Sequence, residues 1–229
     1  MVAQPPVPIA DEIVEKSLRG LWEVVNQLAR LRPAASNEFR VSIFGSARTK
    51  PGDPIYAQVR ELARELSARG CSIVTGGGPG LMQAANEGAQ LGDPKNKHAS
   101  IGIRVDLPFE QNANPYVEQA YTHQTFFTRL HHFARLSSAF VVVDGGIGTA
   151  LESLMIWQLL QVKHLDVPLI FVGPMWKDLV GWAKSHMLDK PTPLANAKDL
   201  DLPVCVDDAA GALAVLDKAL AEFRAKAGK

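Results

Sequence analysis

The chain has 229 residues, of which 47% are hydrophobic, enough to bury one sizeable core. Lysine plus arginine and aspartate plus glutamate number 24 each, so no net basic charge favours a nucleic-acid polymer or an anionic membrane as partner. No apolar run approaches the roughly 20 residues of a membrane span, and the start MVAQPPVPIADE does not resemble a secretory signal. We therefore expect a cytoplasmic protein in which Cys71 and Cys205 are buried, reduced thiols.

The N-terminal segment divides into a proline-rich start and a predicted helix. Residues 1–10 are expected to be disordered, and a single domain is expected over residues 11–226. Apolar residues from Asp11 to Leu31 recur at spacings of three and four, which predicts an amphipathic helix with a nearly heptad seam. This helix either packs onto its own domain or forms a dimer contact, and the sequence leaves both open.

Two predicted strands are each followed by a glycine turn. The strand Arg40–Phe44 precedes Gly45 and Ser46, a common place for a nucleotide to bind. A helix over Pro54–Ala68 leads to the strand Cys71–Thr75, and a triple glycine then opens the next helix (Gly76, Gly77 and Gly78). This turn lacks the Lys-Ser/Thr of a Walker loop. It either allows a ligand to approach the backbone or serves only helix–strand packing.

A candidate arginine follows the third strand, which is predicted over Ser100–Val105. The irregular segment Asp106–Tyr121 is long enough to form a wall of a ligand site. A helix is predicted over His123–Ser137, with an inward stripe of Phe126, Leu130 and Phe133 that contains Arg129. A buried arginine needs a partner. The partner is either a bound phosphate or carboxylate, or Glu152 in a structural salt bridge, unless the side chain merely snorkels to water.

The central stretch of the chain is strand, glycine turn and helix. Phe140–Val143 predicts a buried parallel strand, and the helix after it has Leu151, Leu154, Met155, Leu159 and Val162 on one face. The turn between them brings backbone N–H groups and a helix N-terminus to one point, which suits a phosphate (Gly145, Gly146, Gly148 and Thr149). Glu152, one helical turn further on, would lie beside whatever carries that phosphate.

The C-terminal part continues the alternation of strands and helices. Strands are predicted over Val167–Val172 and Val204–Val206, with a helix over Trp176–Met187 between them. Asp207 or Asp208 is expected to cap a closing amphipathic helix. The pattern predicts an α/β fold, a doubly wound parallel sheet with helices on both faces. Ligands of such sheets bind at the carboxyl ends of the strands, where all three glycine turns lie.

The residue types at these turns narrow the chemistry. The six histidines form no metal-binding pattern, because His131 and His132 are adjacent on a helix and point about 100° apart. No nucleophile elbow is present. A phosphate cradle, Arg129 and Glu152 remain, and this set suits cleavage at a sugar carbon that bears a phosphate further along.

Three segments of the chain resemble the LONELY GUY (LOG) family, often labelled lysine-decarboxylase-like. Asp144–Glu152 is similar to that family's PGGxGTxxE motif, Val74–Asn86 to its second signature, and Phe127–Arg129 to the arginine that precedes the main motif. Leu107–Val117 and the N-terminal helix resemble the longer bacterial branch. Asp144 stands where the family has proline, and Leu130 where a lysine usually follows the arginine.

The resemblance implies a Rossmann-like dimer or higher homo-oligomer that needs no cofactor. It implies hydrolysis of the N-glycosidic bond of AMP or a cytokinin riboside monophosphate, with Glu152 and Arg129 as the catalytic pair. The three glycine turns would bind the substrate. Asp144 and Leu130 lower the expected phosphate affinity, so a non-catalytic nucleotide or cofactor carrier is the alternative. The decarboxylase label is not favoured, because no lysine stands beside a glycine turn to hold pyridoxal phosphate.

Overall fold

The computed structural model describes residues 14–16, 18, 38–95, 97–106 and 113–227. The chain divides into two compact units, residues 1–36 and 37–229, and the fold described below is that of the second unit. Of the predicted helix Asp11–Leu31, residues 14–16 and 18 are described and are helical; the rest, like residues 1–10, lies outside the described residues. The expected disorder of residues 1–10, the role of the helix in packing or in a dimer contact, and the expected domain boundaries remain predictions.

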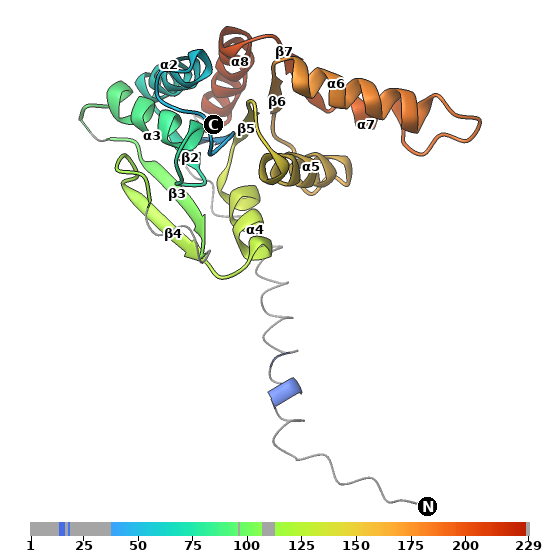
Figure 1. The fold of residues 1–229 in the computed structure, drawn as a ribbon, viewed down its shortest axis with the longest axis horizontal. Helices are drawn as coiled ribbons and strands as arrows, with labels where there is room; N and C mark the ends of the chain where they lie inside the picture. Colours follow the sequence, from blue (N-terminus) through green and yellow to red (C-terminus); the bar gives the residue numbers. More distant parts are fainter. Residues whose placement is uncertain (1–13, 17, 19–37, 96, 107–112, 228–229) are drawn as a thin grey trace, which may run out of the picture. The chain divides into compact units, whose positions relative to one another are not determined.

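In the described part of the chain, seven parallel strands form one sheet (Figure 1). The strand order is β4, β3, β2, β1, β5, β6, β7. Their bounds, in that order, are Gln119–His123, Ser100–Val105, Cys71–Thr75, Phe39–Phe44, Ala139–Val142, Leu169–Val172 and Pro203–Val206. The chain runs outward from β1 to β4 and then returns to β5 on the other side of β1. The switch point of the sheet therefore lies between β1 and β5, where α/β proteins bind ligands.

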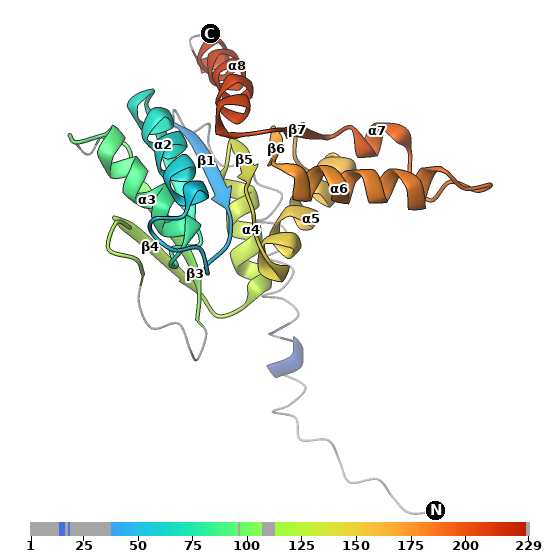
Figure 2. The same cartoon turned by 45° about the horizontal axis from the view of Figure 1, so that its top comes forward.

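Helices cover both faces of the sheet, as predicted (Figure 2). One face carries α2, α3 and α8, and the other carries α4, α5 and α6. The bounds are Pro54–Ala68, Leu81–Gly92 and Ala209–Ala227 on the first face, and Phe126–Leu136, Ile147–Gln161 and Pro174–Ala183 on the second. A π-helical turn, Lys184–Leu188, and the short α7, Ala197–Leu200, follow α6. Within the described residues, no helix combines the length and apolarity needed to cross a bilayer.

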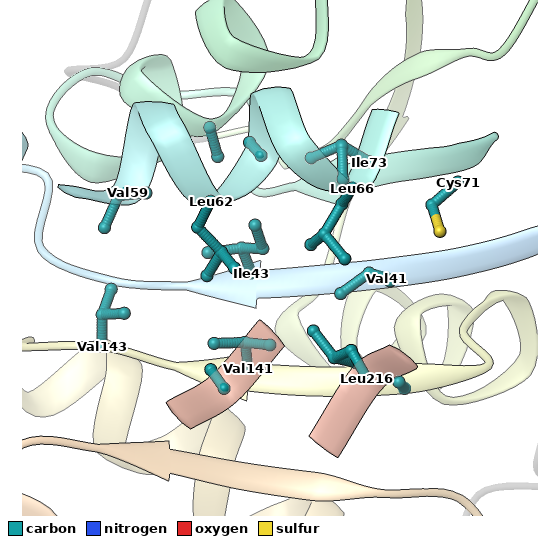
Figure 3. Packing of buried hydrophobic residues seen from close by; sticks show 14 of the residues in the cluster. Val41, Ile43, Val59, Leu62, Leu66, Cys71, Ile73, Val141, Val143 and Leu216 are labelled. Atoms are coloured by element: carbon teal, nitrogen blue, oxygen red, sulfur yellow. The ribbon is translucent and has the colours of Figure 1, made fainter. Parts of the chain in front are cut away.

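Strand residues alternate between the two cores because successive side chains of a strand point to opposite faces. On the first face, Val41 and Ile43 of β1 lie beneath Leu62 and Leu66 of α2, with Leu216 of α8 nearby (Figure 3). On the second face, residues such as Phe44 and Phe140 pack with the helices α4 to α6. Strands buried on both sides give the near-continuous apolar runs from which most of the sheet was predicted.

Several predictions need correction. Cys205, which was expected to be a buried thiol, is only partly buried, whereas Cys71 is buried. The segment Asp106–Tyr121 was expected to be irregular throughout, and its residues 107–112 lie outside the described residues. Gln119–His123, however, forms β4 at the sheet edge. The helix expected over His123–Ser137 consequently begins at Phe126, whose side chain is exposed although it was expected to face inward. The helix expected over Trp176–Met187 changes to a π-helical turn after Ala183.

The apolar face predicted for α5 is the outer face of the helix. Leu151, Leu154 and Val162 are half exposed, and the other two predicted residues, Met155 and Leu159, lie at the margin of this face and pack partly against the core. The residues of α5 that are fully packed against the sheet include Ile156 and Trp157. The reason is that α5 carries apolar residues all round, so that helical periodicity alone does not reveal which side the sheet covers.

Candidate active site

The three glycine turns lie together at the switch point. The Ser46 N–H after β1 donates to the Asp144 carbonyl after β5 at 2.9 Å, and the Leu81 N–H at the start of α3 donates to the Ser46 carbonyl at 2.8 Å. A Cβ at Gly45 would lie only 2.7 Å from Val143 Cγ2. The absence of a side chain at Gly45 therefore lets the turns after β1, β2 and β5 approach one another.

The turn after β5 presents the N-terminus of α5. Gly146 caps the helix, and a Cβ at Gly145 would collide with the Thr149 side chain, which folds back over the turn. A Cβ at Gly146 or Gly148, in contrast, would meet no atom within 4 Å. The first N–H groups of a helix have no acceptor within the helix. Open space above these donors suits an anion. A larger side chain would fit at Gly146 and at Gly148, so packing of the fold does not explain why both residues are glycine.

Arg129 and Glu152 form a buried ion pair from two different helices. Arg129 Nη1 on α4 lies 2.9 Å from Glu152 Oε1 on α5, and each side chain is 11% exposed. Arg129 Nε also donates to the carbonyl of Ile103, within β3, at 2.8 Å. Its guanidinium lies against Gly76, where a Cβ would collide with Nη2. The arginine thus spans from the turn after β2 to Glu152, and the salt-bridge alternative for its partner is present in the structure.

Burial and charge act in opposite directions on Glu152. Loss of water around the carboxyl raises its pKa above the ordinary value, and the guanidinium of Arg129 opposes part of that rise. A carboxyl with a perturbed pKa beside a charge partner, at the ligand-binding edge of a sheet, is a typical acid–base candidate.

The two departures from the family motif have different surroundings. Asp144 is exposed, and a Cβ at Gly173 after β6 would lie 3.6 Å from its Oδ1. The carboxylate therefore lies toward β6, on the opposite side of β5 from β1. Leu130 is buried. Leu130 contributes an apolar side chain to the interior of the fold, where a lysine ammonium would need a partner.

The sequence did not reveal what holds the turn after β2. Gly77 adopts a φ of +71°, which suits glycine, and Thr75, Asn86 and Asn114 bond to one another behind the turn. The available signal was a polar Asn86 among the alanines of the buried face of α3.

The fold and motifs agree with the comparisons to known proteins. Residues 82–216 match the family model described as "Possible lysine decarboxylase", a span that includes both Arg129 and Glu152. The chain belongs to this family. The predicted LOG-type resemblance is confirmed.

Two relatives of the chain carry the names of enzymes that cleave nucleotides. A pyrimidine/purine nucleotide 5′-monophosphate nucleosidase of Escherichia coli K12 is 30% identical over 126 residues, covering 52% of this chain and 28% of that protein. A probable cytokinin riboside 5′-monophosphate phosphoribohydrolase LOGL3 of Oryza sativa is 31% identical over 123 residues, covering 52% of this chain and 57% of that protein. The chain thus spans about a quarter of the length of the first relative.

Solved structures share the fold of this family member. The Moco carrier protein of Chlamydomonas reinhardtii has a TM-score of 0.59 at 22% identity, covering 81% of this chain and 99% of its own. The molybdenum cofactor binding protein of Rippkaea orientalis has a TM-score of 0.59 at 16% identity, covering 80% and 98%. At these identities the likeness concerns the fold.

Proposed function

We propose that the protein is a hydrolase that cleaves the N-glycosidic bond of nucleoside 5′-monophosphates to free base and ribose 5-phosphate. The observation that carries this proposal is the buried Arg129–Glu152 ion pair, placed beside the glycine turns at the sheet switch point. The names of the two relatives support the reaction class, and that of the rice relative supports a cytokinin riboside monophosphate as a substrate. Within this class we propose adenine-type substrates, AMP or a cytokinin riboside monophosphate. We place the protein in the cytoplasm, where such nucleotides are formed.

The substrate phosphate binds at the N-terminus of α5. The open space at Gly146 and Gly148 admits phosphate oxygens to the first N–H groups of the helix, and the helix dipole favours the negative charge. Thr149 and the Gly45–Ser46 turn complete this part of the site. The ribose then lies one helical turn further along α5, beside Glu152.

Glu152 acts on the ribose carbon C1′. As the bond from C1′ to the base nitrogen breaks, its electron pair leaves with the base, and the carboxylate stabilises the positive charge that develops on the sugar. A water oxygen bonds to C1′, and its proton passes through Glu152 to the departing base. Arg129 orients the substrate and favours the ionised form of Glu152. Water is the second reactant, so the reaction needs no cofactor.

We infer that the protein is a homodimer or higher homo-oligomer through the outer face of α5. Ile147, Leu151 and Leu154 follow one another at spacings of four and three on one side of this helix; Ile147 is 89% exposed and the other two 47% each. A contiguous exposed apolar stripe marks an interaction surface, and a second copy of the same stripe is a partner of matching chemistry.

A product assay tests the proposal. The purified protein is incubated separately with AMP, isopentenyladenosine monophosphate, the other common nucleoside monophosphates and the matching nucleosides, and free base and ribose 5-phosphate are measured by chromatography. We expect base only from nucleotides, most from adenine types. Saturable nucleotide binding with no base released on long incubation would favour the non-catalytic carrier instead.

A further inference from the structure

A closed ring of hydrogen bonds lies behind the glycine turn that follows β2. Asn114 Nδ2 donates to Asn86 Oδ1 at 3.0 Å, and Asn86 Nδ2 donates to Ser100 Oγ at 2.9 Å. Ser100 Oγ donates to the Tyr116 carbonyl at 2.8 Å, and the Tyr116 N–H returns to Asn114 Oδ1 at 3.1 Å. Asn86, Ser100 and Asn114 are buried. Each bond has a donor and an acceptor in consistent order, which fixes the orientation of both amides.

Three bonds join the glycine turn to Asn114 and Thr75, and a fourth joins Thr75 to the ring. Asn114 donates twice, from its backbone N–H to the Gly77 carbonyl at 2.8 Å and from Nδ2 to the Gly78 carbonyl at 2.9 Å. The Thr75 hydroxyl donates to Asn86 Oδ1 at 2.7 Å and accepts the Gly77 N–H at 2.9 Å. Asn114 is thus the residue of the ring that holds two successive carbonyls of the turn.

This arrangement sets the direction of one backbone donor. In a trans peptide the C=O of one residue and the N–H of the next point in opposite directions. Because the Gly77 carbonyl points at Asn114, the Gly78 N–H points away from it. The following peptide has no N–H, since residue 79 is proline. At Gly76, the first residue of the turn, the backbone lies against the Arg129 guanidinium.

We propose that Asn114 is a positioning residue that aims the Gly78 N–H at an oxygen atom of the ribose 5-phosphate half of the substrate. The assignment rests on the proposed function and adds a substrate-binding donor on the turn next to Arg129. Asn114 itself touches no substrate; it acts by holding the Gly77 and Gly78 carbonyls. A donor that meets the substrate equally in the ground state and the transition state affects KM rather than kcat.

Two substitutions of Asn114 test the assignment. Both variants keep the backbone N–H that meets the Gly77 carbonyl, but they lose the side-chain bonds to Gly78 and Asn86 that hold this backbone in place. Asn114→Ala removes the side-chain donor, and Asn114→Asp sets a carboxylate oxygen against two carbonyl oxygens. We expect KM for AMP to rise at least tenfold in both, more in Asn114→Asp, with kcat within about twofold of the wild-type value. Ser100→Ala is the matched control, because it breaks the same buried ring without touching the turn. Its KM is expected to stay within about twofold of wild type.

The outcomes separate this proposal from the proposed function. If the wild-type protein releases base but Asn114→Ala keeps the wild-type KM, or Ser100→Ala raises KM as much, the role of Asn114 is refuted and the hydrolase stands. If the wild type releases no base, the dissociation constant for AMP from calorimetry replaces KM, and weaker binding by the Asn114 variants alone supports the role. Thermal melting accompanies each assay; loss of folding in both Asn114 variants would overturn the proposal, since the residue would then serve the fold rather than the turn.

Discussion

The ion pair between Arg129 and Glu152 makes a quantitative prediction about stability. Arg129→Met keeps much of the side-chain volume and removes the charge, which leaves a carboxylate that is 11% exposed without its partner. Breaking a buried pair by removing one member costs about 3–5 kcal/mol. For a chain of this size that corresponds to a fall in melting temperature of roughly 6–20 °C.

The loss of stability in Arg129→Met should depend on pH in a definite direction. Burial already raises the pKa of Glu152, and loss of the guanidinium that opposes the rise raises it further. The folded protein then binds a proton that the unfolded chain has released, so the stability of Arg129→Met falls as pH rises through the folded-state pKa. We expect a smaller deficit at pH 5 than at pH 8 in urea unfolding followed by circular dichroism. In a Glu152→Gln background, Arg129→Met should cost much less. An equal cost in both backgrounds, or a deficit that grows toward acid pH, would refute the buried-charge reasoning.

Three further predictions concern the site and the assembly. Gly148→Ala should leave the melting temperature unchanged or higher, because a methyl group meets nothing there. It should raise KM for AMP at least tenfold, because phosphate occupies that space; a wild-type KM would place the phosphate elsewhere. Gly76→Ala should instead displace Arg129 and lower kcat. The pH profile of kcat/KM should have an acid limb above 4.5, the ordinary value for the Glu152 carboxyl, because its pKa is raised and the ionised form is required; a rate independent of pH between 4 and 7 would argue against this role. Leu154→Glu should convert the proposed oligomer to a folded monomer in light scattering, since it adds a charge to the exposed α5 stripe; an unchanged mass would contradict an interface on α5.

Much of the sheet follows from the sequence because its strands are short apolar runs buried on both faces. β2, for example, was predicted over Cys71–Thr75, the bounds that the structure has. β4 was missed because Gln119–His123 is polar and largely exposed, and only its register with β3 makes it a strand. The side of α5 that meets the sheet was also missed. Because this helix is apolar all round, tertiary packing and not periodicity determines which side is buried.

The sequence allowed the residues of the candidate site to be proposed, but not the contacts between them. The glycine turns and Glu152 follow local patterns, so their positions at the carboxyl ends of strands could be anticipated. Whether Arg129 met Glu152 or a ligand was left open, since the two residues lie on different helices whose relative placement depends on the sheet. The ring around Asn114 joins residues from α3, β3 and the segment after it, and no local pattern indicates such a contact.

A paired assay of wild type and Glu152→Gln is the decisive test of hydrolysis through Glu152. Glutamine keeps the size and one acceptor oxygen of the side chain but not its charge, so AMP binding measured by calorimetry should persist in a folded protein. We expect base and ribose 5-phosphate from the wild type and a loss of turnover by orders of magnitude in Glu152→Gln. Unchanged turnover in Glu152→Gln would contradict the assignment of Glu152 and, with it, the proposed mechanism.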